Sequence, residues 1–201
     1  MARRARVSVA DLEATVEGSV AALGRGLTRD WSVPAGTLRW SCAKTAFHIG
    51  DDLVAYAGQL ASGAQDDYLP FRCRMVRGTP PGGLLDWVSG MGVVLATTVR
   101  AARPQDRAYH SYGMADAEGF TALGAAEVLV HSHDVAEGLG LRYQPDPAVC
   151  ARVTARLFRD LEPHDDPWRL LLWATGRADL PGRGRSRQWT WWAAPEGERD
   201  G

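Results

Sequence analysis

The 201-residue sequence has few cysteines and only one lysine, Lys44, among its 23 lysine and arginine residues. Its three cysteines, Cys42, Cys73 and Cys150, are odd in number, lie far apart and form no CxxC motif. Such usage indicates no disulfide framework and favours a reducing compartment. We therefore expect a cytoplasmic protein.

Long hydrophobic runs and an excess of one charge are also missing. The basic segment from Met1 to Val7 is followed by acidic residues from Asp11 onward, which is unlike a secretory signal. No stretch approaches the roughly 20 apolar residues that cross a bilayer. The formal net charge is only -1. The sequence therefore predicts neither a membrane nor a nucleic acid as partner.

What the sequence does have is apolar residues at helical spacing within a chain that is 45% hydrophobic. Leu12, Val16, Val20 and Leu23 recur at intervals of three and four, as the buried stripe of a helix does. Comparable patterns, with caps and proline breaks at their ends, predict six helices: 9–27, 42–61, 84–102, 116–139, 147–158 and 168–174.

The order of these elements predicts an all-α fold, because helix follows helix without βαβ alternation. Long connections at 62–81 and 103–114 suit a four-helix bundle with crossover connections. We expect a single domain over residues 1–201, with its core at 8–160. Residues 161–201 form a C-terminal extension of short helices and an irregular or short-strand tail.

Glu127 and His131 place polar groups on the core-facing side of the fourth helix. They are four residues apart, so their side chains leave the same face. His48 lies beside Phe47 in the middle of the apolar second helix. Two imidazoles and one carboxylate from facing helices form a three-ligand divalent site with an open position, as in catalytic zinc centres.

The same residues also have simpler interpretations. A Glu-x3-His pair on a helix is often an exposed pair, and a lone core histidine such as His48 is often held by a hydrogen bond. Asp51 and Asp52, beyond His48, and Asp134, beyond His131, are placed to orient the ligand imidazoles.

Three segments resemble a known family. The run 40–60, WSCAKTAFHIGDDLVAYAGQL, resembles the second helix of the DinB-like superfamily, and more narrowly the N-terminal domain of mycothiol-dependent maleylpyruvate isomerase. The run 119–140, GFTALGAAEVLVHSHDVAEGLG, is similar to that family's fourth helix, and 166–183, DPWRLLLWATGRADLPGR, to the end of its short members. The likeness extends over residues 8–183.

The resemblance implies a DinB-like bundle in which His48, Glu127 and His131 bind one divalent metal. Zinc is expected first, and nickel or another first-row ion is an alternative. It also implies that the metal binds the thiol of mycothiol as a cosubstrate and yields a thiolate nucleophile. The separate C-terminal α/β domain of the isomerase has no match in this sequence.

These expectations lead to one main function and two rivals. The main hypothesis is a metal-dependent enzyme, a mycothiol-type transferase or isomerase acting on a small electrophile, as a monomer or homodimer. One rival is a hydrolase or lyase in which the metal activates water without a thiol. The other is a non-catalytic protein that binds a small ligand or a metal.

Two further features lie outside the metal motif. His110 and Tyr112, in the connection before the fourth helix, are candidates for the substrate pocket. Arginines alternate with tryptophans between Arg183 and Trp192. That alternation is found in surfaces that stack nucleic-acid bases, but we interpret it as a tail whose tryptophans pack on the bundle.

Overall fold

Each helix begins close to the residue that the sequence predicts. In the computed structural model, which describes residues 4–186 and 189–198, the helices are α1 (Val9–Gly24), α2 (Cys42–Ser62), α3 (Pro81–Ala101), α4 (Ala117–Leu139), α5 (Pro147–Leu157) and α6 (Pro167–Ala174). Ser8 caps α1 in a capping box with Asp11, and Gly140 ends α4 in the left-handed conformation. The described residues contain isolated β-bridges but no strand, so the all-α prediction is confirmed.

Two helix bounds differ from the prediction for local reasons. Helix α3 begins at Pro81 rather than Leu84, because proline at the first helical position loses no hydrogen bond. Helix α1 ends at Gly24 rather than Leu27. Beyond it the chain turns, and the Gly26 carbonyl accepts a hydrogen bond from the Trp31 indole N–H at 2.9 Å.

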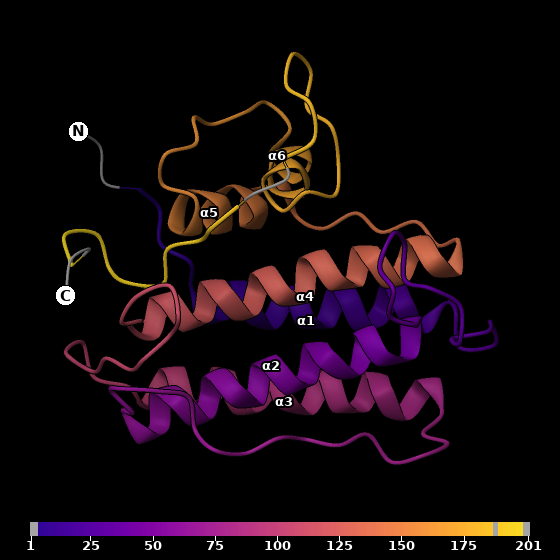
Figure 1. The fold of residues 1–201 in the computed structure, drawn as a ribbon, viewed down its shortest axis with the longest axis horizontal. Coiled ribbons are helices and arrows are strands. Elements are labelled where there is room, and N and C mark those ends of the chain that lie inside the picture. Colours follow the sequence, from indigo (N-terminus) through magenta and orange to yellow (C-terminus); the bar gives the residue numbers. More distant parts are fainter. Residues whose placement is uncertain (1–3, 187–188, 199–201) are drawn as a thin grey trace.

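Helices α1 to α4 form the bundle. Helix α1 packs against α3 and α4, and α2 packs against the same two helices, so α1 and α2 face each other diagonally. Residues 63–80 run the length of the bundle before α3 begins (Figure 1), so α2 and α3 point in the same direction. This is the crossover connection expected from the long segment between the two helices.

Helix α4 is buried on nearly all sides. Helices α1 and α2 cover part of its surface, and α5 covers the side away from α2 and α3 (Figure 1). Its sequence is correspondingly apolar around the whole helix, as expected of a core helix. Glu127 and Asp134 are nevertheless buried in it, at 7% and 1% exposure. Buried carboxylates need partners, so α4 is where functional polar contacts are expected.

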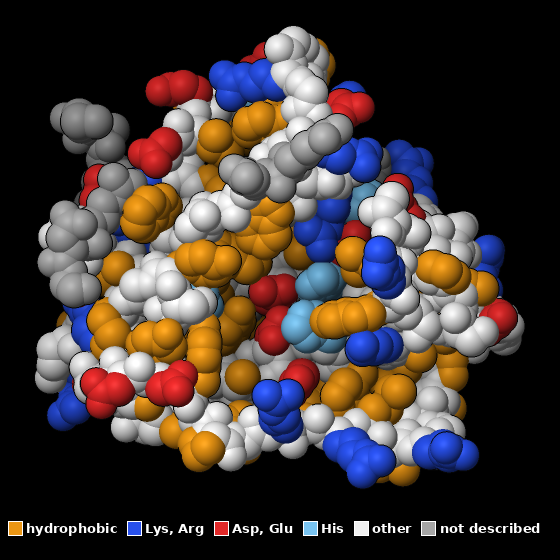
Figure 2. Space-filling view, in the orientation of Figure 1, with side chains coloured by type: hydrophobic (Ala, Val, Ile, Leu, Met, Phe, Trp, Pro, Cys, Tyr) orange, Lys and Arg blue, Asp and Glu red, His pale blue; other side chains and the backbone are white. Residues whose placement is uncertain are grey.

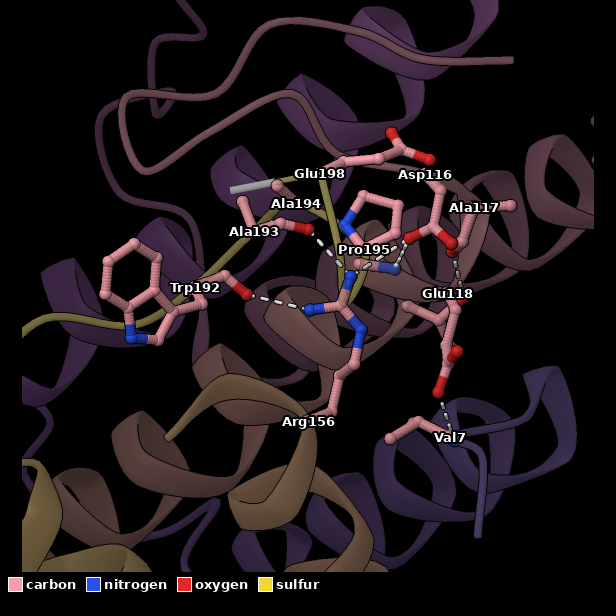
Figure 3. Close-up of polar contacts among 12 residues, drawn as sticks. Val7, Asp116, Ala117, Glu118, Arg156, Trp192, Ala193, Ala194, Pro195 and Glu198 are labelled. Atoms are coloured by element: carbon pink, nitrogen blue, oxygen red, sulfur yellow. Dashed lines mark hydrogen bonds and ion pairs between the residues drawn. The ribbon is translucent and has the colours of Figure 1, made fainter. Parts of the chain in front are cut away.

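Arg156 attaches the C-terminal tail to the start of α4. Its fully buried guanidinium donates to the carbonyls of Trp192 and Ala193, at 2.8 and 2.7 Å, and to the Asp116 carboxylate at 3.0 Å (Figure 3). Asp116 also caps α4. The tail therefore packs on the bundle through Trp191, which is buried, whereas Trp189 is 37% exposed and departs from the expectation. Arg187, within the alternating Arg/Trp segment, lies outside the described residues.

Helix α3 is more apolar than expected, since no stretch of the sequence was expected to approach the length of a membrane span. Of the described residues, only Pro81–Ala101 form a helix that meets the length and composition of a membrane span, with a mean hydropathy of 1.3. A third of that window is buried in the protein, and the helix packs on α1 and α2. Core helices of bundles meet the same criterion, so α3 is weak support for a membrane segment.

Candidate metal centre

His48, Glu127 and His131 come together where α2 crosses α4. One candidate ligand atom from each residue lies within 4.8 Å of the other two. The two imidazole rings are 5.1 Å apart between centroids and inclined at 68°. On α4, His131 Nε2 is 3.2 Å from Glu127 Oε2, as the spacing of four residues predicts.

The donor set suits a divalent cation. Two ligands at about 2.1 Å from a zinc ion are at most about 4 Å apart, close to the spread found here. Two imidazole nitrogens and a carboxylate oxygen are ligands that zinc, nickel and similar ions accept. Glu127 and His131 have little exposure, whereas the His48 side chain is 28% exposed, so an ion among them would be reached from the side of His48.

Hydrogen bonds fix the ligand side chains from outside the cluster. His131 Nδ1 lies 3.0 Å from Asp134 Oδ2, and Asp134 accepts two hydrogen bonds from the Arg177 guanidinium. The Tyr56 hydroxyl donates to Glu127 Oε1 at 3.3 Å. Burial and the negative charge of Glu127 raise the pKa of Tyr56 well above its usual range, so the phenol stays protonated and donates.

The two aspartates after His48 differ in position. Asp52 Oδ2 is 3.2 Å from His48 Nε2, so this carboxyl group adjoins the cluster itself. Burial and the neighbouring Glu127 carboxylate raise the pKa of Asp52 well above its ordinary value. Asp51 lines the same neighbouring pocket as Asp52. On the other side, the Trp40 ring makes an edge contact with His48 at 4.9 Å.

The charges of the cluster favour a bound cation. Burial lowers the pKa of His48, and the neighbouring His131 lowers it further, which keeps this imidazole neutral. Burial opposes a charge on His131, yet hydrogen bonds to Asp134 and Glu127 raise its pKa to about 9. Burial also opposes a charge on Glu127, but the contacts with His131 and His48 lower its pKa overall. Positive charge is therefore stabilised between the carboxylates.

A pocket of about 260 Å³ adjoins the cluster along α2. It is lined by Asp51, Asp52, Ala55, Tyr56, Gln59, Tyr68, Leu69, Phe71 and Arg72. Figure 2 shows histidine and acidic side chains around a hollow near the centre of this face, with hydrophobic side chains on its rim. Asp52 and Tyr56 both line the pocket and contact cluster residues, so a small molecule bound there would lie next to the candidate metal ligands.

His110 and Tyr112 lie near this pocket, in different environments. His110 is 5% exposed, and its ring contacts Tyr56 and Tyr68, which line the pocket. The Tyr112 amide N–H donates to His110 Nδ1 at 3.2 Å, while the Tyr112 side chain is exposed. His110 therefore supports the pocket wall from behind, and Tyr112 fixes the orientation of His110.

Sequence reasoning missed Tyr56 and Arg177. Tyr56 continues the series His48, Asp52, Tyr56 at intervals of four, which places all three on one face of α2. That spacing was a usable signal. Arg177 follows α6 and meets α4 only through the tertiary fold, so its spacing carries no signal. A buried Asp134 does require a positive partner somewhere in the chain.

Comparison with known families gives one match. Residues 14–136 match the family described as the mycothiol maleylpyruvate isomerase N-terminal domain. His48, Glu127 and His131 all lie within the matched residues, and Arg177 lies beyond them. Comparisons with curated proteins and with solved structures found no match to this chain.

Proposed function

The chain belongs to the mycothiol maleylpyruvate isomerase N-terminal domain family, and on this premise we propose that it is a metal-dependent, thiol-using transferase or isomerase acting on a small electrophile. The observation that carries the proposal is the convergence of His48, Glu127 and His131 within 4.8 Å. A pocket lies beside them, and two of its lining residues, Asp52 and Tyr56, contact His48 and Glu127.

In this proposal the two imidazoles and Glu127 hold one divalent ion, with zinc the first candidate. Such an ion, when bound, lowers the pKa of a thiol that it contacts and so supplies a thiolate at neutral pH. The hydrogen bonds from Tyr56 to Glu127 and between Asp134 and His131 keep the donors in place. Removal of a residue that holds a metal ligand in place typically lowers metal affinity or activity by roughly 10- to 100-fold.

The pocket along α2 is the proposed place for the electrophile and part of the thiol. Its wall combines the Tyr56, Tyr68 and Phe71 rings with polar groups, a composition typical of small-molecule sites. Asp52 lines the pocket, and in the proposed reaction it takes the proton that the thiol loses. When the thiolate adds to an electrophilic double bond, Asp52 returns that proton to the carbon that gains the electron pair. Burial and the Glu127 carboxylate raise the pKa of Asp52, which suits both transfers. A low-molecular-weight thiol such as mycothiol and a small electrophile are the proposed partners.

Zinc binding is the first test. Wild-type protein is expected to bind about one zinc ion per chain, measured by competition with a chromogenic chelator. The variant His48→Ala is expected to lose this binding. His133→Ala is the matched control, because His133 lies on α4 but contacts Glu137 and Trp168 instead of the cluster. Equal zinc binding by wild type and His48→Ala would contradict the proposed metal centre.

Thiol chemistry is the second test. Wild-type protein with zinc, mycothiol and monobromobimane is expected to form the thiol–bimane adduct faster than the uncatalysed reaction. The same mixture with His48→Ala should show only the uncatalysed rate. Zinc binding without any acceleration, combined with hydrolysis of ester or amide substrates, would instead favour the hydrolase alternative.

A further inference from the structure

Arg177 connects the C-terminal extension to the metal cluster. Arg177 follows α6 at a turn where Gly176 has a positive φ of 73°. The Arg177 amide N–H donates to the Leu172 carbonyl at 2.7 Å. From this anchored position the guanidinium reaches Asp134 on α4. Nε lies 2.9 Å from Oδ1, and Nη2 lies 2.7 Å from Oδ2, a two-pronged contact. A third donor, Nη1, contacts the Thr175 carbonyl at 3.1 Å.

Asp134 transmits this contact to His131. Its Oδ2 lies 2.7 Å from Arg177 Nη2 and 3.0 Å from His131 Nδ1. An ionised carboxylate only accepts hydrogen bonds, so the proton on His131 belongs on Nδ1. Arg177 Nη2 is itself 3.5 Å from that nitrogen, but a guanidinium cannot accept, so the carboxylate is the acceptor for both donors. Nε2 of His131 lies 3.2 Å from Glu127 Oε2, so with the proton held on Nδ1 it is the nitrogen that would bind an ion between Glu127 and His48.

We propose that Arg177 is a positioning residue of the metal centre: by holding Asp134, it fixes His131 in the Nδ1–H tautomer with Nε2 directed at the ion. The inference rests on the proposed function and extends it to residues beyond the matched family region. The described residues of the C-terminal extension include no candidate metal ligand, yet through Arg177 the extension becomes part of the centre.

The choice of arginine follows from the geometry. Asp134 is 1% exposed, and a buried carboxylate that loses its positive partner must become protonated or turn toward water. Either change weakens the restraint on His131. Lysine keeps the charge but cannot make both parallel contacts, because only the guanidinium has a planar fork of donors. Arg177→Lys should therefore recover part of what Arg177→Met loses.

The test compares three variants with the full-length wild type. Arg177→Met and Arg177→Lys alter the proposed contact. Arg152→Met is the matched control, since Arg152 makes a similar two-pronged contact with Asp11, at 2.5 and 3.1 Å, between α5 and α1. Zinc affinity is measured by chelator competition and stability by urea denaturation. Long-range ¹H–¹⁵N spectra of the zinc-loaded proteins report which nitrogen of His131 carries the proton.

The expected result is a zinc Kd about 10- to 100-fold higher in Arg177→Met, a smaller loss in Arg177→Lys, and unchanged zinc affinity in Arg152→Met despite lower stability. The His131 signals of wild type should show the proton on Nδ1, and in Arg177→Met the Nδ1 signal should shift because the hydrogen bond to Asp134 is weakened. Wild-type affinity in both Arg177 variants, or an equal loss in Arg152→Met, would overturn the inference. If Arg177→Met does not fold, Arg177→Lys against Arg152→Met decides by the same criteria.

The failure of this inference is distinguishable from failure of the proposed function. Wild-type protein that binds zinc through His48, combined with normal affinity in both Arg177 variants, removes only the role of Arg177. Wild-type protein that binds no zinc removes the proposed function, and the role of Arg177 with it.

Discussion

Acid is expected to destabilise the fold through His110. This imidazole is 5% exposed, among the rings of Tyr56, Tyr68 and Tyr112. Burial lowers its pKa from 6.5 to about 4, although the negative charge of Glu127 opposes the shift. Between these two values the unfolded chain binds a proton at this position and the folded chain does not. The buried neutral imidazole therefore costs no stability above pH 6.5, and the free energy of unfolding decreases as the pH falls from 6.5 toward 4.

The size of the effect follows from the two pKa values. Within that window the free energy of unfolding changes by about 1.4 kcal/mol per pH unit for one proton. Lowering the pH from 8 to 5 should thus cost about 2 kcal/mol through His110 alone. The assay is urea denaturation at both pH values for wild type and for His110→Asn. Asparagine presents an acceptor near the position of Nδ1, where the Tyr112 amide N–H donates, and it does not titrate.

The comparison isolates one group, because other titrating residues are common to both proteins. The pH-dependent loss of stability should be about 2 kcal/mol smaller in His110→Asn than in wild type. Equal losses in the two proteins would refute the reasoning, and would mean that His110 is hydrated or paired in a way that leaves its pKa near the unfolded value.

One further substitution tests the metal centre, and two test the packing of the fold around it. Glu127→Gln keeps the shape of a ligand but removes a charge, so zinc affinity should fall, and excess zinc should partly restore the adduct-forming rate in the bimane assay. Gly50→Ala places a Cβ against the Trp87 indole on α3, and should destabilise the bundle by about 1–3 kcal/mol in urea denaturation. Arg156→Met leaves Asp116 and the tail carbonyls without their buried donor, and should cost about 2–4 kcal/mol by the same measurement.

The helices were predictable because their signals are local. Apolar spacing, the Ser8 cap and the Gly140 stop depend on neighbouring residues alone. The pairing of Glu127 with His131 is local for the same reason, since it follows from a spacing of four within one helix. His48 was a candidate because it is a histidine within an apolar helix, and the family resemblance strengthened its assignment to the same centre.

The rest of the site depends on contacts between distant segments. Asp52 was expected to orient an imidazole, and it lies against the His48 nitrogen and the Glu127 carboxylate because α2 crosses α4 there. Arg177 approaches Asp134 only because α5 and α6 fold back over α4. Helix periodicity has no information on such crossings, so sequence reasoning finds the donors more readily than their supports.

The division between donors and supports has a physical origin. The three donors lie within residues 14–136, which match the family, whereas the cation that pairs with Asp134 comes from the extension. Asp134 cannot remain ionised in a buried helix without a positive partner. In this chain Arg177 supplies that positive charge, from a segment beyond the residues that match the family. The tail acts in a similar way at the other end of the site, because the Ala193 N–H donates to the carbonyl of Tyr112, whose own amide orients His110. The extension thus supports the polar groups of the site at two places, through Arg177 at Asp134 and through Ala193 at Tyr112.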